Sequence, residues 1–289
     1  MRRTIFAAVA SAMTLLPVAA HAGPPSGAGN NPRDYIPAPV GTTAMVTYWK
    51  HISGNKYYAN QNKASSGAGI SADVFILRPV HWMKVGSLVF DPQCLIIGQD
   101  TQVDGGGGAT GFSDLVTLAA FWVVNKPERK LWLALTPYIT IPIGEYDKNN
   151  PGNSPGANRW TLRPEIGLAK GFGENLYLDL TGSVEWFQDN DEYAGMELSQ
   201  NLQYHAEAHV SYDFTKSFYG GVDYYGYFGG ETELDGVAQN DKKNNHAIGW
   251  TGAYQVAAGQ QLMLQWKDDV SVKDGAKANT FMLRYLTAW

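Results

Sequence analysis

The stretch QYHAEAHVSY at positions 203–212 places two histidines and a glutamate within five residues. On a helix, His205 and His209 would be neighbours about 6 Å apart, whereas on a strand they would be roughly 13 Å apart. A single metal ion could bridge the two imidazoles only in the helical case. Between positions 201 and 212, apolar or aromatic residues alternate without a break with polar ones, which is typical of a β-strand. The alternation therefore predicts a strand and argues against a metal site within it.

The N-terminus has the features of a secretory signal peptide. Arg2 and Arg3 are followed by an apolar run at 5–20 and by the sequence Ala-His-Ala ending at Ala22. A charged start, a short apolar core and an A-x-A site are typical of an export signal that is removed. The run is too short, and too often interrupted by polar residues, for a membrane-spanning helix. We predict a signal peptide at 1–22, cleaved after Ala22, and export from the cytoplasm.

The composition differs from that of an ordinary water-soluble domain. Only 17% of the residues are charged, 12% are aromatic and 32 are glycine, whereas soluble domains average about 25% charged residues. The single cysteine, Cys94, cannot form an intrachain disulfide. No apolar run after the signal reaches the roughly eighteen residues of a membrane helix, and no basic tract suggests nucleic-acid binding. An exported chain rich in aromatic residues and glycine is typical of a transmembrane β-barrel.

The alternation seen at 201–212 recurs along the whole mature chain. Each alternating segment has about ten to fourteen residues, which is the length of a strand that crosses a bilayer at a tilt. The segments begin near Thr42, Ile70, Ser87, Asp114, Leu131, Arg159, Leu176, Asn201, Phe218, Asn244, Gln261 and Lys277. We therefore predict an all-β fold at 42–289, a transmembrane antiparallel β-barrel of about twelve strands.

The connections between these segments alternate in length, as the two ends of such a barrel require. Long polar connections are expected at 53–69, 100–113, 145–158, 188–199 and 229–243. Short ones are expected at 84–86, 125–130, 171–175, 213–217 and 257–260, and the connection at 272–275 is short as well. Outer-membrane barrels have short periplasmic turns and longer extracellular loops, so we assign the two ends accordingly.

The cost of exposing charge to lipid assigns the two faces of each strand. In the last segment, Phe281, Leu283 and Tyr285 share one face and Arg284 lies on the other. Turning such a strand over would expose its charges to hydrocarbon, at about 2 to 4 kcal/mol each near the midplane. The polar faces therefore point into the lumen, where they would line a solute path. The predicted lumen residues are Arg163, Glu165, Asp179, Glu185, His205, Glu207, His209, Asp223, Lys267, Asp269 and Arg284.

Three assignments stay open at this stage. Asp73 and Arg78 fall on opposite faces of one segment, which a β-bulge or a position near the strand end would explain. The lumen lining could face water or could pair with itself in a filled interior, because about twelve strands fall between filled and open barrels. The Gly- and Pro-rich segment at 23–41 could be a disordered leader or could fold into the barrel as a plug.

Several stretches resemble the outer-membrane transporter family of the MetA pathway of phenol degradation. They are PYITIPIGEY at 137–146, NRW at 158–160, EWFQDND at 185–191, ETELDGVAQND at 231–241 and DVSVKDG at 269–275. The similarity extends from Asp34 to Trp289, with a departure at 111–115, where GFSDL stands in place of a Gly-x-Gly-Asp-Pro pattern. The resemblance implies an outer-membrane barrel and the passage of aromatic or other small hydrophobic molecules.

A channel or transporter for small hydrophobic or aromatic compounds is accordingly the predicted function, without an enzyme activity, a cofactor or a bound metal. The first alternative is an outer-membrane lipid hydrolase, for which His209 and Ser211 have the same-face spacing. The second is a structural or adhesion barrel whose acidic loops bind divalent cations and lipopolysaccharide. The loop residues in question are Asp189, Asp191, Glu192, Glu231, Glu233, Asp235 and Asp241.

The expected location is the outer membrane of a Gram-negative bacterium. The partners would be the lipid bilayer, lipopolysaccharide, the transported solute and the barrel-assembly machinery. Phe281, Tyr285 and the terminal Trp289 form an aromatic pattern that resembles the C-terminal signal read by that machinery.

Overall fold

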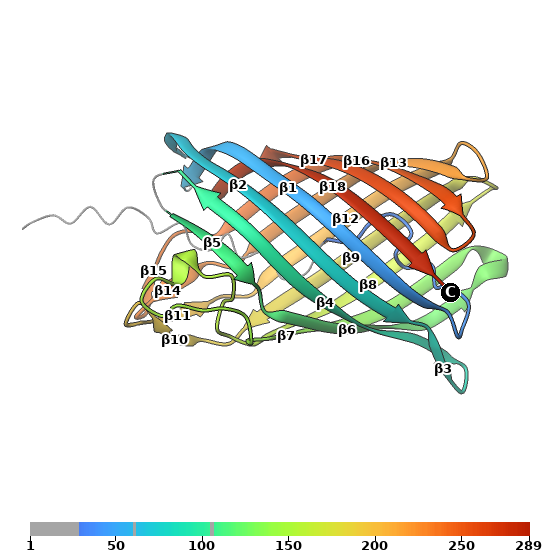
Figure 1. Cartoon of the computed structure of the whole chain (residues 1–289), viewed down its shortest axis with the longest axis horizontal. Coiled ribbons are helices and arrows are strands. Elements are labelled where there is room, and N and C mark those ends of the chain that lie inside the picture. The colour runs from blue at the N-terminus through green and yellow to red at the C-terminus, as the bar shows by residue number, and fades with distance from the viewer. Residues whose placement is uncertain (1–28, 60–61, 105–106) are drawn as a thin grey trace, which may run out of the picture.

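The computed structural model describes residues 29–59, 62–104 and 107–289, and these form a closed antiparallel β-barrel of 12 strands (Figure 1). The predicted signal peptide at 1–22 and the start of the Gly- and Pro-rich segment, at 23–28, lie outside the described residues. The wall strands are β1 (Thr43–Ala59), β2 (Asn62–His81), β4 (Leu88–Val103), β6 (Leu115–Lys126), β7 (Leu131–Ile141), β8 (Thr161–Phe172), β9 (Leu176–Phe187), β12 (Gln203–Asp213), β13 (Phe218–Gly229), β16 (Lys243–Ala257), β17 (Gln260–Ser271) and β18 (Gly275–Ala288).

Each wall strand pairs antiparallel with the next along the chain, and β1 pairs with β18 to close the barrel. Closure gives every wall strand a hydrogen-bonded neighbour on both edges, and a sheet surrounded by lipid needs this because no water is present to bind its backbone groups. The all-β barrel of about twelve strands is therefore confirmed. In Figure 1 the short turns and the C-terminus lie at the right, and the longer connections lie at the left. These ends are called the short-turn end and the long-loop end below.

The remaining elements extend the barrel at its two ends. β3 (Met83–Val85) pairs with the start of β4 at the short-turn end, and β5 (Gly107–Phe112) pairs with the other end of β4. Two long connections contribute a small separate sheet, made of β10 (Asn190–Tyr193), β11 (Met196–Gln200), β14 (Thr232–Leu234) and β15 (Val237–Ala238). Two 3-10 turns, η1 (Pro127–Arg129) and η2 (Pro151–Asn153), complete the description. Within the described part of the chain, no helix has the length and hydrophobicity needed to cross a membrane.

At two of the predicted loops the wall strands continue as paired strand instead. β1 and β2 have 17 and 20 residues, so most of the connection expected at 53–69 is a protruding hairpin. Likewise β4 and β5 occupy most of the connection expected at 100–113. Both segments are rich in polar residues and glycine, which breaks the alternation that marks a lipid-facing strand. Outside the bilayer the strands can still pair through their backbones. Both faces of such a strand can carry polar side chains in water, so the apolar–polar alternation that identifies a membrane strand is lost.

Burial in the wall strands follows the pattern of a membrane barrel, with apolar side chains outside and polar ones inside. In β12, Tyr204 and Val210 are exposed, whereas His205, Glu207 and His209 are buried. In a barrel whose outer surface meets lipid, this arrangement keeps the charged groups away from hydrocarbon.

Asp73 and Arg78 do lie on opposite faces of β2, and no β-bulge separates them. The β1–β2 register runs without a shift from Ser71 to His81, so the alternation is unbroken and the bulge explanation is wrong. Asp73 points outward, accepts a hydrogen bond from Trp49 Nε1 at 3.0 Å, and lies 3.1 Å from His51 Nδ1. It stands on the long-loop side of the exposed Phe75, which fits the other explanation, a position near the end of the membrane-spanning part of the strand.

Candidate functional site

The segment before β1 lies inside the barrel. Residues 29–42 form no wall strand, and Figure 1 shows them as the blue trace within the barrel toward the short-turn end. The backbone N–H of Asn30 donates to Glu207 Oε2 at 2.9 Å, and its side-chain Nδ2 donates to Glu165 Oε1 at 2.9 Å. The hydroxyl of Tyr35 also donates to Glu165, and its carbonyl accepts from Trp122 Nε1 at 2.9 Å. Side chains of the wall thus hold this segment in place.

Close packing against a glycine adds to this attachment. The ring of Tyr35 lies on β8 at Gly167, where a Cβ atom would stand 2.1 Å from the ring carbon Cζ. No side chain larger than hydrogen fits between the strand and that ring. Gly167 is therefore part of the seat that receives the segment.

An ion-pair cluster holds the middle of the segment. Asp34 accepts from Arg284 Nη1 at 2.9 Å and lies 3.9 Å from Arg78 Nη1. Although burial alone would raise the pKa of the Asp34 carboxyl, Arg284 and Arg78 hold it below its usual value. The neighbouring Arg33 donates to Ser211 and Asp213, at 3.0 and 2.6 Å. Its guanidinium also lies 4.2 Å from the ring centre of Tyr177 and 4.0 Å from that of Tyr219, a cation–π arrangement.

The two histidines of β12 belong to two separate clusters of ionisable groups. His209 lies between Asp223, at 2.8 Å from Nδ1, and Glu207, at 3.6 Å from Nε2. His205 lies 3.3 Å from Glu185 by its Nε2 atom. The two histidines therefore have different carboxylate partners, as their separation along a strand requires.

The other predicted lumen residues occupy different levels of the barrel. Arg163 stacks on Tyr138 at 4.0 Å, and Asp179 pairs in register with His209 on the adjacent strand. Lys267 lies 5.3 Å from the ring centre of Tyr225. Nine of the predicted lumen residues are buried, namely Arg163, Glu165, Asp179, Glu185, His205, Glu207, His209, Asp223 and Arg284. Lys267 and Asp269 are half-buried, and Asp269 accepts the backbone N–H of Ala278 at 3.0 Å.

The structure brings some of these residues together and leaves others apart. Glu165 and Glu207 come from different strands and meet at Asn30, and Glu207 continues through His209 to Asp223. Arg284 instead contacts the ion-pair cluster nearer the short-turn end. Phe281 contacts Trp49 edge to face at 5.9 Å. Tyr285 and Trp289 are exposed, and the backbone N–H and carbonyl of Trp289 pair with those of Thr43.

The sequence analysis names neither of two groups of lumen residues. The first is Asn30, Arg33, Asp34 and Tyr35, which belong to the segment for which a plug was one of two open interpretations and whose sequence carries no periodicity. The second consists of buried aromatic residues that lie on the same, inward face of a strand as the charged residues. Tyr225 follows Asp223 by two residues, so the alternation of faces along the strand could have identified it. The predicted lumen residues were chosen among charged residues and histidines, so this group was left out.

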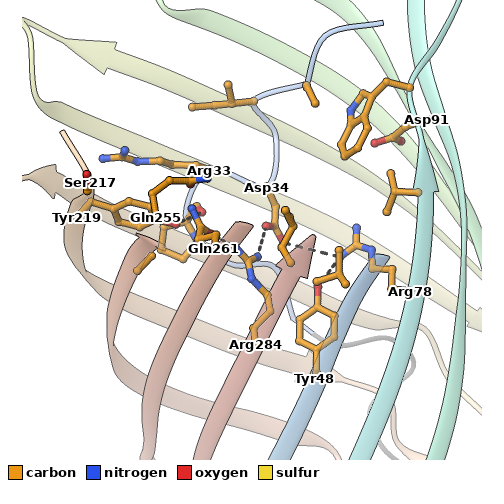
Figure 2. A pocket seen from close by; sticks show the side chains of 18 of the residues that line it. Arg33, Asp34, Tyr48, Arg78, Asp91, Ser217, Tyr219, Gln255, Gln261 and Arg284 are labelled. Carbon is orange, nitrogen blue, oxygen red and sulfur yellow. Dashed lines mark hydrogen bonds and ion pairs between the residues drawn. The ribbon is translucent and has the colours of Figure 1, made fainter. Parts of the chain in front are cut away.

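A cavity of about 340 Å³ lies between the segment and the wall at the short-turn end. Figure 2 shows its side chains, with Arg33 and Asp34 from the segment, Arg78 and Arg284 on either side of Asp34, and the rings of Tyr48 and Tyr219. A second cavity, of about 380 Å³, lies beside Pro37, Pro39 and Trp132. The segment therefore fills only part of this end of the lumen.

The residues named for the two alternative functions do not come together in one site. Ser211 binds Arg33, whereas His209 binds Asp223 and Glu207, so the two have different partners. Several acidic loop residues bind within the loops: Asp241 accepts from Thr232 at 2.7 Å, and Asp235 accepts from the backbone of Glu197 at 2.8 Å. Across the ranges that the structure describes, no three or more His, Cys, Asp or Glu side chains form a group that could hold a metal ion.

Comparison with solved structures gives one strong and several weaker similarities. An outer membrane channel from Pseudomonas putida F1 is similar with a TM-score of 0.86 and 28% identity, over 90% of this chain and 100% of that one. The KdgM porin in complex with disordered oligogalacturonate gives a TM-score of 0.51 at 7% identity, over 84% and 99%. The NanC porin gives 0.51 at 10% identity, over 84% and 98%. The two porins show a shared barrel fold only.

Comparison with curated proteins finds no match. A family model does match, over residues 53–285, which include every wall strand in whole or in part. The match agrees with the resemblance found in the sequence. This chain belongs to the family described as the MetA-pathway of phenol degradation.

Proposed function

We propose that this protein is an outer-membrane channel that takes up small hydrophobic or aromatic compounds, and that residues 29–41 form a plug whose position controls passage. The observation that carries the proposal is the attachment of residues 30–35 to a wall that is already closed without them. A plug held by side chains can move while the backbone ladder of the wall stays intact. The strongly similar channel from Pseudomonas putida supports a transport function.

The lumen contacts explain how such a plug could be both ordered and releasable. Asn30 and Tyr35 meet the carboxylate of Glu165, and Asp34 meets Arg284. Hydrogen bonds to charged groups contribute about 1.5 to 3 kcal/mol each, so a few of them suffice to hold a short segment against its entropy. Residues 29–40 can leave their seat without breaking a covalent bond or a strand pairing of the wall, while Gly41 and Thr42 stay paired with Trp82.

The membrane context is part of the same proposal. The outward apolar faces contact the bilayer, the extracellular rim would meet lipopolysaccharide, and the signal peptide would be cleaved after Ala22. The C-terminal pattern of Phe281, Tyr285 and Trp289 would direct insertion by the barrel-assembly machinery. The polar lining at Arg163, Glu165, Glu185, His205 and Glu207 would border the solute path, with no catalytic role.

Uptake into liposomes tests the proposal directly. Refolded protein is reconstituted, and the entry of phenol and of toluene is compared with that into empty liposomes and into liposomes that hold an unrelated closed barrel. We expect faster entry than either control gives, and faster still when residues 29–36 are deleted. Entry at the rate of the empty liposomes for both forms of the protein would refute a channel for these compounds.

A further inference from the structure

The cavity at the short-turn end combines free cationic donors with an apolar wall. Arg284 is 5% exposed and lines this cavity. Its Nη1 and Nη2 donate to Asp34 and Gln261, at 2.9 and 2.6 Å, while Nε has no hydrogen-bond partner among the described residues. A buried donor without an acceptor is costly, so an acceptor placed there would be bound favourably.

A second guanidinium shares this property. Arg33 uses its Nε and Nη1 atoms on Ser211 and Asp213, and its buried Nη2 atom lacks a partner in the part of the chain that the structure describes. Figure 2 shows Arg33 and Arg284 on the border of the same cavity. Guanidinium groups match carboxylates in shape and charge better than they match neutral oxygens.

The charges around the cavity favour an anion. The basic lining residues outnumber the acidic ones, with Arg33, Arg78, Lys216 and Arg284 against Asp34, Asp91 and Asp213. Two of the acids are already neutralised, because Asp34 pairs with Arg284 and Asp213 pairs with Arg33. These pairs leave Arg78 and Lys216 against Asp91, so the lining keeps an excess of positive charge, while Arg33 and Arg284 offer their unpaired N–H donors.

Part of the remaining wall is apolar. Val46, Val80 and Leu286 line the cavity, together with Ala253, which is 1% exposed. The volume of about 340 Å³ is at the lower end of the roughly 300 to 1,000 Å³ of small-molecule sites. A small ligand with one charged end and one apolar end fits this lining better than a fully polar ion or a pure hydrocarbon.

We infer that this cavity binds a small carboxylate with an apolar body, of the benzoate type, at the exit from the lumen. The carboxylate meets Arg284 and Arg33, and the body lies against Val46, Val80 and Leu286. The inference rests on the proposed function in one respect: it extends the substrates of the channel from neutral hydrophobic compounds to their acidic derivatives.

Binding to the purified full-length protein in a non-ionic detergent tests the site without any transport. Isothermal titration calorimetry compares benzoate with benzyl alcohol and inorganic phosphate, which keep only the apolar body or only the charge. We expect one benzoate per barrel, and binding at least about tenfold weaker for both other probes. Equal binding of benzyl alcohol or of phosphate, or no binding of benzoate, would overturn the inference.

Two variants locate the site. Arg284→Gln should weaken benzoate binding at least about tenfold, because it removes the charge and the free Nε donor. The matched control is Arg159→Gln, which removes a lumen arginine near the long-loop end that stacks on Phe187 at 4.6 Å. It should bind benzoate as the parent does. An equal loss in both variants, or no loss in Arg284→Gln, would place the anion elsewhere.

Ala253→Leu separates this site from the plug, because Arg284→Gln also removes a partner of Asp34. Leucine at this position fills part of the cavity while the ion pairs of Asp34 and Arg284 remain. It should abolish benzoate binding, and unchanged binding would contradict the inference. Calorimetry and liposome uptake test the two proposals separately. A barrel that binds benzoate but does not pass phenol or toluene would refute the channel proposal alone. A barrel that passes phenol or toluene but does not bind benzoate would refute this site alone.

Discussion

Replacing Glu207 by alanine tests whether the plug is held from within the lumen. Glu207 Oε2 accepts the backbone N–H of Asn30 at 2.9 Å and lies 3.6 Å from His209 Nε2. The side chains of His209 and Glu207 are 0% and 6% exposed, so their interactions are little screened by water. Removing the carboxylate leaves a buried N–H without its acceptor and a histidine with Asp223 as its remaining partner.

The size of the effect on the plug follows from the lost contact with Asn30. Glu207 and His209 both belong to β12, so their contact is the same whether the plug is seated or displaced. A hydrogen bond to a charged group contributes about 1.5 to 3 kcal/mol. We expect the plugged state to lose about 1.5 to 3 kcal/mol relative to a state with the plug displaced, a shift of about 10-fold to 150-fold in their ratio.

Single-channel recording in planar bilayers measures that ratio. The Glu207→Ala barrel should open more often or conduct more than the parent, and it should still migrate as a folded barrel in an unboiled gel, because the wall ladder does not use this side chain. Glu207→Gln is the matched control, since its amide oxygen can still accept from Asn30, and its effect should be smaller. A folded Glu207→Ala barrel with the conductance of the parent would refute the idea that this contact holds a plug.

Three further predictions concern other parts of the structure. Gly167→Leu should displace the Tyr35 ring and raise conductance, whereas Gly182→Ala, at a glycine with no atom within 4 Å of the added Cβ, should leave conductance unchanged; equal conductance in both would contradict the seat at Gly167. Because the folded-state pKa of Asp34 lies below its ordinary value of 3.8, its stabilisation of the plug is present above about pH 4 and lost as pH falls through the folded pKa. Conductance should therefore rise only on acidification below about pH 4, and Asp34→Asn should abolish that step; a step near neutral pH would point to another group. Deleting Trp289 should lower the amount of heat-modifiable barrel in the outer membrane, and unchanged amounts would count against a role in assembly.

The wall of this barrel could be predicted from the sequence because lipid imposes a simple rule on it. Residues such as Leu162 and Ile166 alternate with Arg163 and Glu165, and the cost of placing charge in hydrocarbon allows one orientation only. The rule stops at the membrane boundary. The hairpin of β1 and β2 continues beyond it, and the polar, glycine-rich sequence at 53–69 predicts a loop there.

The lumen obeys no comparable rule, and this is why its contacts could not be predicted. Its inward residues were identified by parity, but their partners come from a segment without periodicity. Nothing in the sequence of Asn30 to Tyr35 places them beside Glu165 and Glu207, which lie more than a hundred positions further along the chain. Long-range pairs between a coil and a lining depend on three-dimensional fit, such as the contact of Tyr35 with Gly167.

The division between wall and plug also separates stability from function. The wall closes through backbone hydrogen bonds between every neighbouring pair of strands, so substitutions in the lumen leave its main stabilising interactions in place. The plug depends instead on a few buried charged contacts, at Glu165, Glu207 and Arg284. Each contact contributes only a small number of kcal/mol, and the loss of one changes the plugged population by orders of magnitude without unfolding the barrel. Such a protein can alter its permeability through single side chains of the lumen while keeping the fold that its family shares.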